Sequence, residues 1–192
     1  MKVIIDTNSL LSLVRYYLPF DKKGILFNFF KKKIEEGEII VIDKVYTQCL
    51  YTSKGIILKK LDFLLDKPFL KSAKAPRNTE LILAPNTKRF FHLMNSAFVN
   101  NIVRKSRNIT DVEFETLKNS HIEDADMKMI LLCLNMIDNG ETEVVIVTEE
   151  TSESNDNKLF KKIPAMCKEL EIRCITLPEL IELYEEIDLH FK

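Results

Sequence analysis

The sequence predicts an α/β protein with a three-layer α/β/α arrangement, built on a parallel sheet of four or five strands. Four runs rich in β-branched and apolar residues recur along the chain, at 3–5, 39–42, 144–147 and 172–177. Between these runs, apolar residues repeat at helical spacing. Strands that alternate with helices favour a parallel sheet whose two faces are both covered by helices.

The first strand and helix meet at Asp6. The run Val3-Ile4-Ile5 stops at this acid, and Thr7, Asn8 and Ser9 are residue types that cap helices. Apolar residues then recur at helical spacing as far as Leu18. Asp6 is therefore expected at the junction between a strand and a helix, either as a helix cap or as a ligand-binding group.

The next elements repeat this alternation. Helical spacing over 26–34 predicts a second helix, which Gly37 ends. The strand at 39–42 follows, and Asp43 is expected to cap a short helix over 45–50. These elements complete a first strand-helix-strand unit.

From about 52 to 121 the order of the elements is less regular, and we expect a mainly helical insertion there within a single domain, 1–192. Apolar spacing predicts helices over 56–65 and 88–105, and Pro68, Pro76 and Pro85 mark loops between them.

The last part of the chain returns to the alternating pattern. A helix is predicted over 127–137, then the strand 144–147 and a polar loop over 151–158. Pro164 opens a helix that runs to Leu170, and Pro178 starts the last one after the strand 172–177.

Charge and composition narrow the possible partners. The 192-residue chain carries 28 basic and 29 acidic residues, so its net charge gives no sign of a nucleic-acid partner. One segment is locally basic, because no acid occurs between Glu80 and Asp111; its cations are Lys88, Arg89, Arg104, Lys105 and Arg107. No apolar run is long enough to span a bilayer, no signal-peptide pattern precedes Asp6, and the four cysteines form no CxxC pair. We therefore expect a cytoplasmic protein with reduced thiols and no membrane contact.

Three groups of acids are expected at one edge of the sheet. Asp6 follows the first strand and Glu149 and Glu150 follow the third, and parallel strands end on the same edge, where ligands bind in open α/β sheets. Asp126 lies one turn before Ile130 on the buried stripe of its helix, so its carboxylate should point inward. Converging carboxylates repel one another unless a cation neutralises them, and hard oxygen ligands suit Mg²⁺ or Mn²⁺.

These motifs resemble, in order, those of the PIN-domain nucleases. The matching pieces are Asp6-Thr7-Asn8 after a strand, Ala125-Asp126 at the start of a later helix, and Val147-Thr148-Glu149-Glu150 at a strand end; the segment 162–177 is similar to a subfamily of toxin-type ribonucleases. The resemblance implies that Asp6, Asp126 and Glu150 hold one or two Mg²⁺ or Mn²⁺ ions for RNA hydrolysis, with Glu149 as a further candidate ligand. It also implies RNA as partner, and it leaves room for an antitoxin protein and for a homodimer. The segment 52–121 is larger than a minimal PIN domain needs, and a lid, a dimer surface and an RNA-contacting arm are the roles open to it.

Four polar residues near these acids have two possible roles each. Thr7, Asn8 and Thr148 orient the carboxylates or a metal-bound water, or they only cap backbone groups. Asp124 is a helix cap or a ligand.

One departure from the family pattern counts against activity. PIN domains carry a central acid, and Gln48 stands at the best-matching position. A second hypothesis is therefore a catalytically degenerate PIN-like module that binds RNA or protein. A haloacid-dehalogenase-like phosphatase fits poorly, because it needs an Asp at position 8, where the chain has Asn8.

Overall fold

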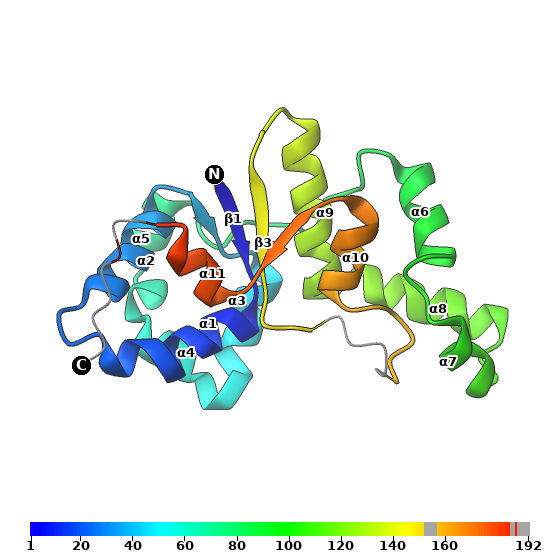
Figure 1. Cartoon of the computed structure of the whole chain (residues 1–192), viewed down its shortest axis with the longest axis horizontal. Helices are drawn as coiled ribbons and strands as arrows, with labels where there is room; N and C mark the ends of the chain where they lie inside the picture. The colour runs from blue at the N-terminus through cyan, green and yellow to red at the C-terminus, as the bar shows by residue number, and fades with distance from the viewer. Residues whose placement is uncertain (152–156, 185–186, 188–192) are drawn as a thin grey trace.

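The computed structural model describes residues 1–151, 157–184 and 187, and these contain one four-stranded sheet in which every pairing is parallel (Figure 1). The strands are β1 (Lys2–Ile5), β2 (Ile39–Ile40), β3 (Val144–Val147) and β4 (Arg173–Ile175), in the spatial order β2-β1-β3-β4. The predicted α/β fold is confirmed. β2 is shorter than the predicted run 39–42, because Val41 and Ile42 pair with Arg77 on the outer side instead of with β1.

Helices cover both faces of the sheet and complete three layers. Helices α2 (Ile25–Glu35) and α11 (Leu177–Glu182) lie on one side, and α9 (Ala125–Asp138) and α10 (Ile163–Leu170) on the other (Figure 1). Strand residues 3–5 and 145–147 are fully buried between these layers. Burial on both faces explains why the strands read as continuous apolar runs in the sequence.

The first helix is less regular than its sequence pattern predicts. Helix α1 (Thr7–Ser12) passes into the π-helical turn η1 (Leu13–Tyr17) and then into the 3₁₀ turn η2 (Leu18–Phe20), where Pro19 ends the regular hydrogen bonding. Asp6 is its N-cap and accepts a hydrogen bond from the N–H of Thr7. The predicted junction of a strand and a helix at Asp6 is thus confirmed.

The segment 52–121 consists of short helices, and two sequence-based boundaries there are wrong. The turn η3 (Thr52–Gly55) follows α3 (Asp43–Tyr51). The predicted helix over 56–65 is two pieces, α4 (Ile56–Lys60) and η4 (Asp62–Leu65), because Leu61 leaves the helical backbone region. Helix α5 (Lys67–Ala73) was not predicted, since Pro68 reads as a loop residue but lies in its first turn.

The predicted long helix over 88–105 is broken in the middle. It consists of α6 (Thr87–Asn95) and α7 (Asn101–Ser106), and the residues between them pair with a distant segment. Val99 forms an antiparallel bridge with Phe160, and the Asn100 side chain caps α7. Helix α8 (Asp111–Ile122) was not predicted either; Thr110 and Glu113 start it with a capping box. No helix in the described part of the chain is long and apolar enough to cross a membrane.

The later elements match the sequence pattern closely. Helices α9, α10 and α11 and strands β3 and β4 lie where they are predicted, within a few residues at their ends. Of the predicted polar loop over 151–158, residues 152–156 lie outside the described residues.

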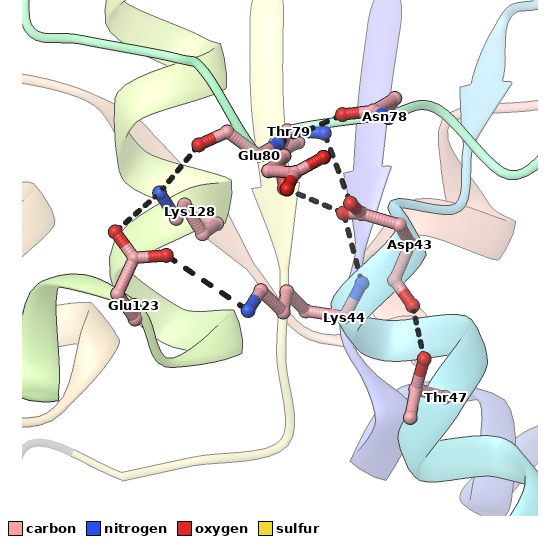
Figure 2. A network of polar contacts seen from close by, with 8 residues as sticks. All are labelled: Asp43, Lys44, Thr47, Asn78, Thr79, Glu80, Glu123 and Lys128. Carbon is pink, nitrogen blue, oxygen red and sulfur yellow. Dashed lines mark hydrogen bonds and ion pairs between the residues drawn. The ribbon is translucent and has the colours of Figure 1, made fainter.

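A polar network fixes the start of α9 against the end of β2 (Figure 2). The buried ammonium of Lys128 lies 2.8 Å from a carboxylate oxygen of Glu123 and 3.5 Å from the Glu80 carbonyl oxygen, while Lys44 approaches Glu123 at 3.9 Å. The same segment also contacts α3, because the Asp43 carboxylate accepts hydrogen bonds from the backbone N–H and the hydroxyl of Thr79, at 3.1 and 2.5 Å. The segment 78–80 therefore links α3 to α9 at the carboxyl edge of the sheet.

We expect Glu123→Ala to destabilise the protein by about 1–3 kcal/mol, because it leaves the buried Lys128 ammonium without its carboxylate. Lys128→Met, which removes the charge but keeps the volume, should stay within about 1 kcal/mol of wild type. Urea unfolding of the two variants measures this difference. Equal losses in both would mean that the ion pair itself, rather than the burial of an unpaired charge, matters.

Candidate functional site

Asp6 is a buried carboxylate at the end of β1, held by donors on both of its oxygens. Its Oδ1 accepts from the N–H of Thr7 at 2.6 Å, and its Oδ2 accepts from the hydroxyl of Thr148 at 3.0 Å. Burial raises the pKa of Asp6, and these hydrogen bonds offset part of that rise. Asp6 is therefore both the helix cap and a fixed carboxylate at the carboxyl edge of the sheet.

Asp126 lies in the first turn of α9, is half-buried, and is close enough to Asp6 and Glu150 for their charges to act on it. Burial, together with the negative charges of Glu150 and Asp6, raises its pKa to about 7. Neither of its oxygens accepts a hydrogen bond from any described residue, in contrast to Asp6. Asp126 is thus the open carboxylate of the group.

Glu149 and Glu150 follow β3 in sequence but face different elements. Glu150 accepts a hydrogen bond from the N–H of Ile163 at the start of α10, at 3.2 Å, and its charge acts on both Asp6 and Asp126. Glu149 accepts from the N–H of Leu177 at 2.8 Å and the hydroxyl of Ser9 at 3.4 Å. Glu149 therefore stabilises the start of α11, and Glu150 belongs to the same group of acids as Asp6 and Asp126.

The other predicted supporting residues lie around Asp6, with one exception. The Thr7 hydroxyl donates to the side-chain oxygen of Gln48, and the backbone N–H of Asn8 helps to lower the pKa of Asp6. Thr148 also accepts from the N–H of Glu150, at 3.2 Å. Asp124 stands at the N-cap position of α9 without making a capping bond; its carboxylate lies 3.1 Å from His121 Nδ1 instead.

The donor chemistry of Asp6, Asp126 and Glu150 fits a hard divalent cation. All three offer carboxylate oxygens, and the lack of a donor at Asp126 leaves an oxygen pair available. Among the described residues, no three His, Cys, Asp or Glu side chains form a ready-made metal-binding group. Mg²⁺ is commonly bound by one or two carboxylates together with waters and substrate phosphates, so the protein alone need not complete its shell.

The basic segment divides into engaged and exposed cations. Arg104 lies 2.6 Å from Asp111 and its guanidinium stacks over the ring of Phe114, 4.0 Å from the centroid. Arg107 donates to the carbonyl oxygen of Asn157. Arg107 and the remaining three cations, Lys88, Arg89 and Lys105, are exposed. Of this segment, Arg107 approaches the loop that follows Glu150.

Sequence reasoning missed one cation beside the acids. Lys158 Nζ lies 3.8 Å from a carboxylate oxygen of Glu150, and its charge lowers the pKa of Asp126 against the larger effects that raise it. Lys158 lies in a polar loop without periodicity, so no local signal distinguishes it from a solvated lysine. Its place follows from the distant pairing of residues 98–100 with 159–161.

Fold and site together define an α/β protein with a cluster of carboxylates at the carboxyl edge of a parallel sheet. Residues 82–186, more than half of the chain, match the family described as "Domain of unknown function (DUF4411)", and the chain belongs to this family. The matched part includes Asp126 and Glu150, while Asp6 precedes it. Neither the curated proteins nor the solved structures include a match to the chain.

We expect the stability of the protein to fall as the pH rises from about 4 towards 7, through the raised pKa of Asp126. In this window the folded protein holds a proton that the unfolded chain has released, so folding is favoured at the acidic end. Asp126→Asn cannot titrate and should flatten this dependence, gaining about 1–3 kcal/mol over wild type at pH 8.

Urea unfolding at pH 5 and pH 8 tests this expectation. Asp138→Asn is the matched control, because Asp138 is exposed at the far end of the same helix. Identical pH dependence in wild type and Asp126→Asn would mean that folding does not raise the pKa of Asp126.

Proposed function

We propose that this protein is a PIN-like ribonuclease that uses Mg²⁺ or Mn²⁺ to hydrolyse RNA phosphodiester bonds. The observation that carries the proposal is the convergence of Asp6, Asp126 and Glu150 from three separate elements, with Asp126 left without a donor. Repelling carboxylates that lack protein cations in sufficient number are typical of a site that binds a divalent ion.

The chain's own residues divide the work of such a site. Asp6, fixed by Thr7 and Thr148, holds one oxygen position rigidly, while Asp126 and Glu150 supply the others. When bound, the metal activates a water and stabilises the charge that develops on the phosphate. No side chain needs to act as a covalent nucleophile.

The positions of the PIN-like motifs support this assignment. Asp6-Thr7-Asn8 lies at the junction of β1 and α1, Ala125-Asp126 opens α9, and Thr148 to Glu150 follow β3. Each motif thus occupies the strand or helix end that the resemblance implies. A toxin role under the control of an antitoxin remains a prediction of the resemblance alone.

Gln48 favours the second candidate, a PIN-like module that binds RNA or protein without cutting. Its side-chain oxygen accepts a hydrogen bond from the hydroxyl of Thr7, the residue that follows Asp6. A neutral amide at this position supplies an oxygen but no charge. A site with one carboxylate fewer binds a divalent cation more weakly, and that loss separates the two candidates.

Asp6→Asn should reduce Mn²⁺-dependent cleavage of single-stranded RNA by about 100-fold or more, because it removes the fixed carboxylate. The amide keeps an oxygen for the Thr7 N–H, so its thermal unfolding should stay close to that of wild type. Cleavage assays and Mn²⁺ titration on the same samples measure both effects. Asp62→Asn, at an exposed aspartate outside the site, is the control.

Gln48→Glu tests the departure from the family pattern. Glutamate keeps the oxygen that accepts the Thr7 hydroxyl, and the exposed position tolerates a charge, so we expect tighter Mn²⁺ binding and faster cleavage. If wild type neither binds Mn²⁺ nor cuts while Gln48→Glu does both, the binding module is the better assignment. If Asp6→Asn and Gln48→Glu both match wild type, the carboxylates are not the site.

The exposed cations Lys105 and Arg107 should contribute to RNA affinity through phosphate contacts. Replacing both with Gln should reduce the slope of log affinity against log salt by about 1.4, at roughly 0.7 per phosphate contact on a single strand. Arg104→Gln should leave the slope unchanged and lower stability instead, since its guanidinium is held by Asp111 and Phe114. Fluorescence anisotropy of a labelled RNA in the Asp6→Asn background, at several KCl concentrations, measures the slopes. An unchanged slope in the double variant would assign these residues to packing or dimerisation.

A further inference from the structure

Lys158 is a cation that lies against the candidate site. Its ammonium lies 3.8 Å from Glu150 and acts electrostatically on Asp126, whereas the ion pairs of Arg104 and Lys161 are made with Asp111 and Glu169, outside the acid group. The proposed nuclease function assigns the acids but leaves this lysine without a role.

The backbone on the C-terminal side of Lys158 is held by long-range hydrogen bonds. The Leu159 carbonyl oxygen accepts from Asn100 N–H at 2.7 Å, and Lys161 N–H donates to Phe98 at 2.8 Å. The buried Leu159 side chain packs with Val99 and Phe114. Lys158 therefore projects from a fixed segment.

The Lys158 side chain is free to change its partner. It is 59% exposed, and its contact with Glu150 is long for an ion pair. A lysine ammonium is a compact point charge on a flexible stem, which suits binding of a phosphate oxygen. Arg107, which donates to the carbonyl oxygen of the neighbouring Asn157, adds a second positive charge on the same side.

We propose that Lys158 binds the scissile phosphate of the RNA, and that its ion pair with Glu150 is the resting contact which the substrate replaces. This inference rests on the proposed nuclease function and adds a residue to it. Lys158 would neutralise a non-bridging phosphate oxygen while the oxygen of a water molecule bonds to phosphorus and the P–O ester bond to the leaving strand breaks. The attacking water would release its proton to solvent, and the leaving oxygen would take up a proton from solvent, so Lys158 itself would transfer no proton. In the absence of RNA and metal, the same ammonium offsets part of the repulsion among the acids.

The test compares Lys158→Gln and Lys158→Arg with Lys161→Gln, a control three residues along whose lysine pairs with Glu169. Three measurements are made on each protein: Mn²⁺ titration without RNA, RNA affinity in EDTA against KCl concentration, and Mn²⁺-dependent cleavage. Thermal unfolding checks that each variant is folded.

Each measurement has a definite expected result. Lys158→Gln should bind Mn²⁺ about threefold to tenfold more tightly, because a competing cation is gone, and it should lower the RNA salt slope by about 0.7. Its kcat/KM should fall by about 10- to 100-fold, mostly in kcat, because the charge is needed most as the phosphate gains negative charge. Lys158→Arg should recover most of the rate, and Lys161→Gln should match wild type throughout.

The outcomes separate this inference from the function on which it rests. If wild type cleaves RNA and Lys158→Gln cleaves equally fast, Lys158 does not bind the scissile phosphate, although the nuclease assignment stands. The same conclusion follows if Lys161→Gln loses as much rate. If wild type neither cleaves RNA nor binds Mn²⁺, the proposed function fails, and the role of Lys158 at a scissile phosphate fails with it.

Discussion

The carboxyl edge of this sheet depends on one parallel pairing, in which β1 and β3 run side by side and end together. Ile5 pairs with Val147, the N–H of Asp6 donates to the Val147 carbonyl oxygen at 2.9 Å, and the Thr148 hydroxyl closes on the Asp6 carboxylate. A slip of one residue in this register would turn every buried β-branched side chain to the opposite face. The apolar core therefore fixes the register, and the register fixes the distance between Asp6 and the acids that follow β3.

The third acid reaches this edge through α9, whose position is set by different forces. Its apolar face is buried against β3 over 127–133, which fixes the axis of the helix. The network of Lys128, Glu123 and the Glu80 carbonyl oxygen then fixes its first turn relative to the segment beside β2. Asp126 is thus held by packing and by its neighbours, while its own carboxylate makes no protein hydrogen bond among the described residues. A side chain placed so firmly and bonded so little is available to a ligand.

Much of this arrangement could be predicted from the sequence, because it depends on local patterns. Three β-branched residues followed by an acid place Asp6 at a strand end, and the spacing to Ile130 turns Asp126 inward. The different partners of Glu149 and Glu150 are harder to predict. Adjacent residues of an extended chain point to opposite faces of the sheet, but the sequence does not say which face α10 covers and which face α11 covers. The break between α6 and α7 and the place of Lys158 have the same long-range cause. Residues 98–100 pair with 159–161, about 60 positions away along the chain, and no periodicity within 88–105 records that pairing.

The two aspartates of the site show how one fold keeps two carboxylates in different states. Asp6 is the more deeply buried, yet a backbone N–H and a hydroxyl stabilise its charge, so its hydrogen bonds oppose the effect of burial on its pKa. Asp126 has no such donors, and burial together with two neighbouring negative charges brings its pKa to about 7. Near neutral pH Asp126 is therefore partly protonated, and a positive charge that enters the site stabilises its ionised form. Lys158 supplies part of that positive charge from the rim, at 3.8 Å from Glu150, and is too exposed to neutralise three acids. The negative charge that Lys158 does not neutralise destabilises the folded chain slightly, and a bound divalent cation would remove this repulsion. For this reason the same feature that weakens the fold at this edge is consistent with the metal-dependent function that we propose.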